Sequence, residues 1–194
     1  MLIVVDGPDS VGKTTQCGLL RDSLIRKGTE AVVLKTLDST VIGTLLGNLL
    51  RGGVITAPEE QLFAFLLATA RLYRERITPA LAKGVTVILD RGVGSHLSYF
   101  GALGFGRGQL EAMLWFIPKD LPTITILLDM DVARALKRKK SPSKFDQMGE
   151  EFFGKQRRIF LALAREKGWT VLNADRSIQA IHQEILEALK RETV

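Results

Sequence analysis

The first 27 residues contain three consecutive features that restrict the fold strongly. Residues Leu2–Asp6 form an apolar run rich in β-branched side chains, which is typical of a strand buried on both faces. Residues 7–14 then read Gly-Pro-Asp-Ser-Val-Gly-Lys-Thr, and Lys13–Lys27 carries leucines at helical spacing. A strand, a glycine-bounded loop and a helix start form an anion cradle, because loop N–H groups point inward and the helix dipole adds positive charge. The pattern predicts a loop that binds the phosphates of a nucleoside triphosphate.

This loop has the full spacing of a P-loop, in which Gly-Lys-Thr follows a first glycine after four intervening residues. In such a loop Lys13 reaches the β- and γ-phosphates, and the Thr14 hydroxyl ligates Mg²⁺. The alternative is a chance glycine-rich turn, which the complete pattern in a strand–helix context disfavours. We therefore expect ATP and Mg²⁺ as cofactors. The expected ATP-binding residues are Gly7, Pro8, Asp9, Ser10, Val11, Gly12, Lys13, Thr14 and Thr15.

Composition narrows the choice of partners. The net charge of +6, from 27 basic and 21 acidic residues, suits an anionic partner, and a nucleotide satisfies it as well as a nucleic acid does. Basic residues form a run only at positions 137–140, and no basic stripe is interleaved with aromatic residues. We therefore expect no nucleic-acid partner. Cys17 is the only cysteine, which excludes an internal disulfide and a cysteine-based metal site.

The chain shows no sign of export or membrane insertion. Its N-terminus passes from Met1 directly into a strand, without the basic region or the cleavage site of a signal peptide. Its longest apolar stretches, such as residues 62–70, fall short of the roughly 18 residues that a membrane span needs. We expect a cytoplasmic protein without a membrane partner.

Strand-like and helix-like stretches alternate along the whole chain. The expected strands are Leu2–Asp6, Ala31–Lys35, Val85–Asp90, Thr123–Asp129 and Thr170–Asn173. The expected helices are Lys13–Lys27, Val41–Leu50, Glu59–Ala82, Gln109–Phe116, Val132–Lys139, Glu150–Lys167 and Ile178–Lys190. This pattern predicts one α/β domain over residues 1–194, with a five-stranded parallel sheet flanked by helices on both faces. Residues 92–108, which contain six glycines, and 140–148 are expected to be the least regular.

An acidic residue ends the third expected strand, and a basic residue follows it. Asp90 ends the strand and Arg91 comes next. In folds of this kind ligands bind beyond the carboxyl ends of the strands. Asp90 can organise Mg²⁺ beside the P-loop, and the Arg91 guanidinium can hold a second phosphate as a bidentate fork. The alternative is a capping aspartate followed by a surface arginine.

A second basic region is expected to form a lid over residues 138–148. The run at 137–140 and Lys144 surround the hydrophilic break Ser141–Ser143. Phosphoryl transfer needs cations that gather round the migrating group when the site closes, and the P-loop itself contains no arginine. We therefore expect Lys144 to act in catalysis. The alternative is a solvated helix end whose charges complement the dipole.

Taken together, these motifs resemble the thymidylate kinases, a family of P-loop nucleoside monophosphate kinases. The resemblance covers nearly all of the chain and rests on the order and spacing of several short motifs. These motifs are Asp6–Gln16, the stretch Leu62–Leu81 with Phe65, Leu89–Arg91 with Ser95 and Tyr99–Gly101, Lys144–Asp146, the helix around Arg157 and Phe160, and Asn173–Ile178. The resemblance implies a P-loop NTPase fold with a short lid, phosphorylation of dTMP to dTDP at the expense of ATP, and a homodimer.

The resemblance also implies roles for individual residues. Asp9 would accept a hydrogen bond from the 3′-hydroxyl of the acceptor sugar, and Arg91 would hold the acceptor phosphate. Phe65 would stack on the pyrimidine, although ordinary core packing is the alternative for an apolar residue on a helix. Tyr99 would crowd the 2′-carbon and so favour deoxyribose. The other residues expected to contact the substrate are Lys35, Arg71, Ser95 and His96, and the expected catalytic set is Lys13, Arg91, Asp9 and Lys144.

Three departures from the family pattern bear on base specificity. The family usually has tyrosine at the position of Gly92, and often Arg-Glu-Pro-Gly-Gly-Thr where this chain reads Lys-Thr-Leu-Asp-Ser-Thr from Lys35. An arginine that recognises the base usually follows the stacking phenylalanine by four residues, and that position is Thr69 here. Arg71 or Arg74, about one helical turn away, are the candidates to compensate. A kinase for another deoxynucleotide or a deoxynucleoside, and a non-catalytic nucleotide-binding regulatory protein, remain alternatives.

Overall fold

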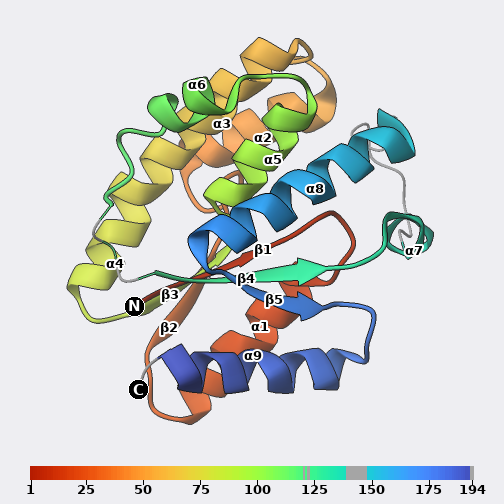
Figure 1. Ribbon diagram of the computed structural model, residues 1–194. Helices are drawn as coiled ribbons and strands as arrows, with labels where there is room; N and C mark the ends of the chain where they lie inside the picture. The colour runs from red at the N-terminus through yellow and green to blue at the C-terminus, as the bar shows by residue number, and fades with distance from the viewer. Residues whose placement is uncertain (120, 122, 139–147, 193–194) are drawn as a thin grey trace.

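The centre of the molecule is a five-stranded parallel sheet, as the sequence predicts, and its strand order is β2-β3-β1-β4-β5. The computed structural model describes residues 1–119, 121, 123–138 and 148–192 (Figure 1). The strands are β1 (Leu2–Asp6), β2 (Ala31–Leu34), β3 (Thr86–Asp90), β4 (Thr123–Asp129) and β5 (Thr170–Asn173). Most of these residues are buried or half-buried because helices cover both faces.

Successive residues of β1 show how the two faces are covered. Ile3 and Val5 point into a core cluster with α1 (Lys13–Arg26) and α9 (Ile178–Glu192). Leu2 and Val4 point the other way, into a cluster with the middle of the chain. This alternation follows from the period of two along a strand. Figure 1 shows α1 and α9 on one side of the sheet and α3, α5 and α8 on the other.

The remaining helices build the second layer and the connections. Their bounds are α2 (Val41–Gly52), α3 (Pro58–Leu72), η1 (Tyr73–Ile77), α4 (Thr78–Ala82), α5 (Val93–Ala102), α6 (Arg107–Met113), α7 (Val132–Lys137) and α8 (Gly149–Lys167). None of the helices in the described part of the chain combines the length and the apolar character that a membrane span needs. Cys17 is a free, buried cysteine.

The predicted single helix Glu59–Ala82 is instead three continuous helical segments. Helix α3 passes into one π-helical turn, η1, before α4. The Thr78 N–H donates to the Tyr73 carbonyl, five residues back. Pro79 follows at once and has no N–H to continue the ordinary ladder, so the widened turn lies directly before the proline.

The prediction that residues 92–108 are irregular is wrong, because α5 occupies Val93–Ala102 and α6 begins at Arg107. The glycines that suggested irregularity allow close packing. A Cβ atom at Gly94 would lie 2.6 Å from the Trp169 ring and 2.7 Å from Asp6 Oδ2. A residue without a side chain is therefore needed where α5 approaches the end of β1.

The strand register brings the two predicted motifs together. Val5 pairs with Asp90 across β1 and β3, and the Arg91 N–H donates to the Val5 carbonyl at 3.1 Å. The loop after β1 and the Asp90–Arg91 pair therefore emerge side by side at the carboxyl edge of the sheet. This is the edge at which doubly wound folds bind ligands.

Candidate functional site

The P-loop has the backbone geometry of an anion cradle. Gly7 and Gly12 have φ values of 140° and 95°, and Ser10 has a φ of 64°. No room exists for a side chain at Gly7, because a Cβ there would collide with the Leu128 carbonyl oxygen. Helix α1 begins after Gly12 without a side-chain cap or an acidic residue in its first turn. Its first N–H groups and its positive dipole end are therefore directed at the loop, where a phosphate would be held.

Lys13 is buried inside this loop, and its ammonium group donates to the Pro8 carbonyl. Burial and, next, the nearby positive charge of Arg91 lower the pKa of Lys13 from 10.5 to about 7, against the opposing effect of three carboxylates. The carboxylates around the Lys13 ammonium group therefore do not fully compensate its positive charge. A polyphosphate would supply the missing negative charge.

Thr14, Asp90 and Lys35 form a connected polar group at one end of the site. The Thr14 hydroxyl donates to Asp90 Oδ2 at 2.6 Å, and Lys35 Nζ lies 3.2 Å from the same carboxylate oxygen. The Thr14 and Asp90 oxygens are hard donors of the kind that Mg²⁺ prefers, and Mg²⁺ often takes only one or two protein ligands beside phosphates and water. The residues therefore fit Mg²⁺ brought in with a nucleotide. Within the described residues no group of three or more His, Cys, Asp or Glu side chains is arranged to hold a metal.

Arg91 lies between the P-loop and the rest of the site. Its guanidinium donates to Asp9 Oδ1 at 2.5 Å, and its backbone has a φ of 76°, in the left-handed region. Asp6 supports the turn that follows, because one carboxylate oxygen accepts the Gly92 N–H at 3.2 Å and the Ser95 hydroxyl. Burial raises the pKa of Asp6, although these hydrogen bonds act in the opposite direction.

Aromatic side chains form the other end of the site. The Phe65 ring packs edge to face on His96 and on Phe100, with ring centroids 5.6 and 5.9 Å apart. His96 Nδ1 donates to the Gly92 carbonyl at 3.1 Å, so Nε2 accepts from the Thr69 hydroxyl at 2.8 Å. Burial lowers the pKa of His96, which favours this neutral form.

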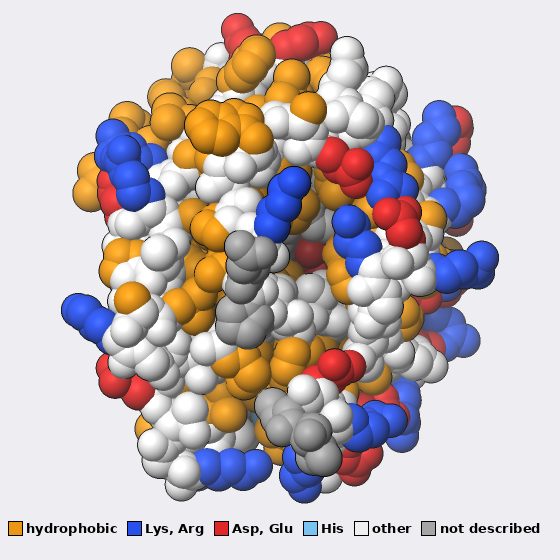
Figure 2. Space-filling model, turned by 60° about the vertical axis from the view of Figure 1, so that its left-hand side comes forward, with side chains coloured by type: hydrophobic (Ala, Val, Ile, Leu, Met, Phe, Trp, Pro, Cys, Tyr) orange, Lys and Arg blue, Asp and Glu red, His pale blue; other side chains and the backbone are white. Residues whose placement is uncertain are grey.

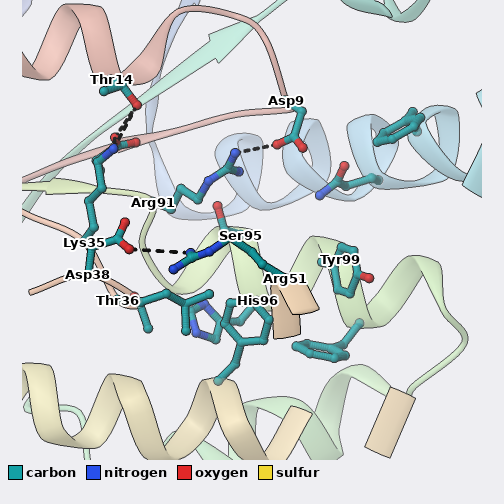
Figure 3. A pocket seen from close by; sticks show the side chains of 16 residues that line it. Asp9, Thr14, Lys35, Thr36, Asp38, Arg51, Arg91, Ser95, His96 and Tyr99 are labelled. Atoms are coloured by element: carbon teal, nitrogen blue, oxygen red, sulfur yellow. Dashed lines mark hydrogen bonds and ion pairs between the residues drawn. The ribbon is translucent and has the colours of Figure 1, made fainter. Parts of the chain in front are cut away.

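A cavity of about 320 Å³ joins these groups, and Figure 3 shows Arg91 pointing to Asp9 on one side of it, with His96 and Tyr99 below. Nine residues predicted from the sequence line this cavity: Asp9, Thr14, Lys35, Phe65, Asp90, Arg91, Ser95, His96 and Tyr99. The cavity therefore has cationic and metal-compatible groups at one end and aromatic walls at the other. This combination suits a molecule with a phosphate and a flat ring.

Of the residues predicted to contact the acceptor, Arg71 is not brought into the cavity; Lys13 and most of the P-loop also lie outside its lining, in the adjoining cradle. The Arg71 guanidinium pairs with Glu75 at 2.6 Å on the same helical face. Its predicted substrate contact is therefore not supported by the geometry. Arg74 pairs with Glu75 as well, at 3.6 Å. Lys144 and most of the predicted lid lie at positions 139–147, outside the described residues.

Sequence reasoning missed seven residues that also line the cavity. They are Thr36, Leu37, Asp38, Arg51, Phe100, Phe153 and Gln156. Arg51 lies in the last turn of α2, and its guanidinium lies 3.5 Å from an Asp38 carboxylate oxygen. Gln156 was detectable as a polar residue on the buried face of α8, next to Phe152 and Phe153. Phe100 lies within the motif Tyr99–Gly101, and Thr36, Leu37 and Asp38 lie in the stretch after Lys35, but neither pattern indicates which of its side chains enter a cavity.

The fold and this site define a P-loop nucleotide-binding protein of the α/β class. The family model "Thymidylate kinase" matches residues 5–185, and the chain belongs to the thymidylate kinase family. It is 32% identical over 201 residues to the thymidylate kinase of Thermomicrobium roseum, covering 97% of this chain and 96% of that protein. It is 34% identical to the thymidylate kinase of Pelodictyon phaeoclathratiforme, at 97% and 95% coverage. It is 32% identical to the probable thymidylate kinase of Pyrococcus abyssi, at 98% and 96% coverage.

Proposed function

We propose that this protein transfers the γ-phosphoryl group of ATP to dTMP, giving dTDP and ADP. A phosphate oxygen of dTMP attacks the γ-phosphorus in line, and the bond from that phosphorus to the β,γ-bridging oxygen breaks. The observation that carries the proposal is the Asp9–Arg91 ion pair, which joins the phosphate cradle of the donor to the cavity for an acceptor. Positioning and charge compensation supply most of the catalysis in such a transfer.

The donor end of the reaction rests on Lys13 and Thr14. Lys13 would hold the β- and γ-phosphates within the loop, and the N–H groups at the start of α1 would bind the same oxygens. Thr14 and Asp90 would hold Mg²⁺, which neutralises phosphate charge when it is bound. Lys35 lies beside both residues and would lie close to the phosphates as well.

The acceptor end rests on Arg91, Phe65 and Tyr99. Arg91 would hold the dTMP phosphate, and Phe65 would stack on the pyrimidine. Tyr99 would pack against the sugar, and Asp9 would accept a hydrogen bond from its 3′-hydroxyl. We propose that Lys144 completes the positive charge around the transferring group. The catalytic contribution of Lys144 can be separated from acceptor binding, because Lys144→Ala would lower kcat while the Kd for dTMP stays unchanged.

A panel of acceptors tests the function. The purified protein is mixed with ATP, Mg²⁺ and either dTMP, dUMP, dCMP, dGMP or UMP, and diphosphate formation is followed by chromatography. We expect the highest kcat/KM with dTMP and no turnover with Lys13→Met. If no monophosphate becomes a diphosphate although ATP binds, the protein is a nucleotide-binding regulator and the proposal is wrong.

The same panel tests a second candidate, a kinase for another pyrimidine deoxynucleotide. The observation that favours it is the position of Thr69, which bonds to His96 and is absent from the lining of the cavity. An arginine donor at this helical position is therefore replaced by a buried neutral pair. A higher kcat/KM with dUMP or dCMP than with dTMP would select this candidate.

We also propose that the protein forms a homodimer through α2 and α3. The two helices pack against each other, and Phe63 and Leu67 lie 62% and 49% exposed on α3. Leu45 on α2 is 53% exposed. Hydrophobic side chains also gather over the upper part of the face drawn in Figure 2. Exposed apolar side chains at this density are typical of a surface that another subunit covers.

A further inference from the structure

Gln156 is a buried polar residue without a role in the function proposed above. It lies on α8, is 4% exposed and lines the cavity. Its amide makes no hydrogen bond within the described residues, and its atoms reach the open space of the cavity instead of being enclosed by protein. A ligand that fills the cavity must therefore supply a partner, since an amide left unsatisfied in a buried place costs about 1–3 kcal/mol. An amide that is directed at a cavity and lacks an internal partner indicates a ligand.

The packing of α8 places Gln156 at the aromatic end of the cavity. Phe152, four residues earlier on the same face of α8, packs edge to face on Tyr99 with ring centroids 5.4 Å apart. Phe153, three residues before Gln156, also lines the cavity. This face of α8 therefore lies against α5, which carries His96 and Tyr99.

The other neutral polar side chains of the cavity use hydrogen-bonding groups within the protein or lie elsewhere in the cavity. Both nitrogens of His96 are used within the protein, by Gly92 and Thr69. The Ser95 hydroxyl donates to Asp6. Thr36 follows Lys35 after β2, and Figure 3 shows it with Lys35 and Asp38, away from Tyr99. The Tyr99 hydroxyl donates to Gln61 at 3.3 Å, so Gln156 is the described neutral lining residue beside the aromatic walls whose donors and acceptor are both unused within the described protein.

We propose that Gln156 is a further substrate-binding residue, which hydrogen-bonds the polar edge of the pyrimidine of the acceptor nucleotide. Thymine presents an N3–H donor flanked by carbonyl acceptors, and an amide presents the matching acceptor and donors. When the ring stacks between Phe65 and its neighbours, this edge leaves water and needs such a partner. The proposal rests on the proposed function, because it assumes a pyrimidine nucleotide as the acceptor.

Gln156→Met tests the proposal, because it keeps the length of the side chain and removes its hydrogen-bonding groups. We expect the Kd for dTMP, measured by calorimetry without ATP, to rise about tenfold, as loss of a typical hydrogen bond predicts. The Kd for ATP and the melting temperature should stay unchanged, because the amide has no partner within the described protein. Gln183→Met, the same change on the exposed face of α9, is the control and should leave every value unchanged. If Gln156→Met lowers the melting temperature, Gln156→Leu provides a second test of the same loss.

A sugar contact is distinguished with 3′-deoxythymidine monophosphate, which lacks the 3′-hydroxyl. If Gln156 contacts the base, its substitution weakens the binding of dTMP and of this analogue by the same factor. A loss seen with dTMP alone would assign Gln156 to the sugar and overturn the proposal. A Kd for dTMP within twofold of the wild-type value would also overturn it. Wild-type protein that binds dTMP but does not phosphorylate it would refute the proposed function and leave the Gln156 test intact, whereas wild-type protein that does not bind dTMP refutes both.

Discussion

Arg91 and Asp9 form an ion pair at 2.5 Å that links the end of β3 to the P-loop. The two residues are 82 positions apart in the sequence, and the pairing of β1 with β3 brings them together. The side chain expected to hold the acceptor phosphate is therefore oriented by the loop expected to hold the donor. A shift of either element would change the alignment of both phosphates.

Replacement of Arg91 by lysine should impair use of the acceptor selectively. Arg91→Lys keeps the charge but loses the planar fork that can bind Asp9 and a phosphate together. We expect kcat/KM for dTMP to fall about 10- to 100-fold, in line with the loss of one or two charge-assisted hydrogen bonds. The Kd for ATP should change little. Arg107→Lys, at a bidentate pair with Glu166 outside the site, is the matched control. An unchanged kcat/KM would show that Arg91 does not hold the acceptor.

Lys13 should make stability depend on pH in the alkaline range. Burial and Arg91 lower the pKa of Lys13 from 10.5 to about 7 in the folded protein, so the unfolded chain binds more protons between these values. The contribution of Lys13 to the free energy of unfolding therefore rises with pH across this interval. Lys13→Met has no such group. Its melting temperature should exceed that of the wild type most at pH 7 and below, and the difference should shrink as the pH approaches 10. A difference that is constant from pH 6 to pH 10 would contradict the prediction.

The Thr69 hydroxyl should stabilise the folded protein through its hydrogen bond to His96, at the aromatic end of the cavity. Thr69 is 3% exposed and donates to His96 Nε2 at 2.8 Å. The isosteric change Thr69→Val leaves this nitrogen buried without a donor, which costs about 1–3 kcal/mol of unfolding free energy. Chemical denaturation measures the loss. Thr86→Val provides the control, a buried strand threonine for which the described structure shows no side-chain hydrogen bond, and it should be neutral or stabilising. Equal effects of the two changes would argue against the Thr69–His96 hydrogen bond.

The double variant Phe63→Asp, Leu67→Asp should separate the proposed dimer. Both side chains are exposed on α3, so the substitutions add charge to the proposed interface without disturbing the core. We expect wild-type protein to elute as a dimer in size-exclusion chromatography with light scattering, and the variant as a folded monomer. Ile25→Asp, at an apolar residue that is 52% exposed on α1, is the control and should stay dimeric. A wild-type monomer would refute the dimer.

Prediction from sequence succeeded where contiguous residues carry the whole signal. The strand β1, the P-loop and α1 follow one another, and their backbone conformations depend on neighbours in the chain. It failed for α5, because the glycines of residues 92–108 resemble a loop pattern. Only the packing of Gly94 against Trp169 shows that a missing side chain serves a close contact there. The same limit applied to Arg71: its position within one helical turn of Thr69 was compatible with a substrate contact, but in the folded protein its guanidinium pairs with Glu75.

The sequence alone determined the chemistry of the donor site and the succession of strands and helices. Short-range hydrogen bonding and the period of apolar residues encode both, so local reasoning was sufficient. The tertiary structure decided which faces of α3, α5 and α8 meet at the cavity, and therefore that His96 bonds to Thr69 while Gln156 lines the cavity. The Thr69–His96 hydrogen bond joins residues 27 positions apart, and the cavity gathers lining residues from Asp9 to Gln156. They depend on how helices pack against one sheet, which no local pattern specifies.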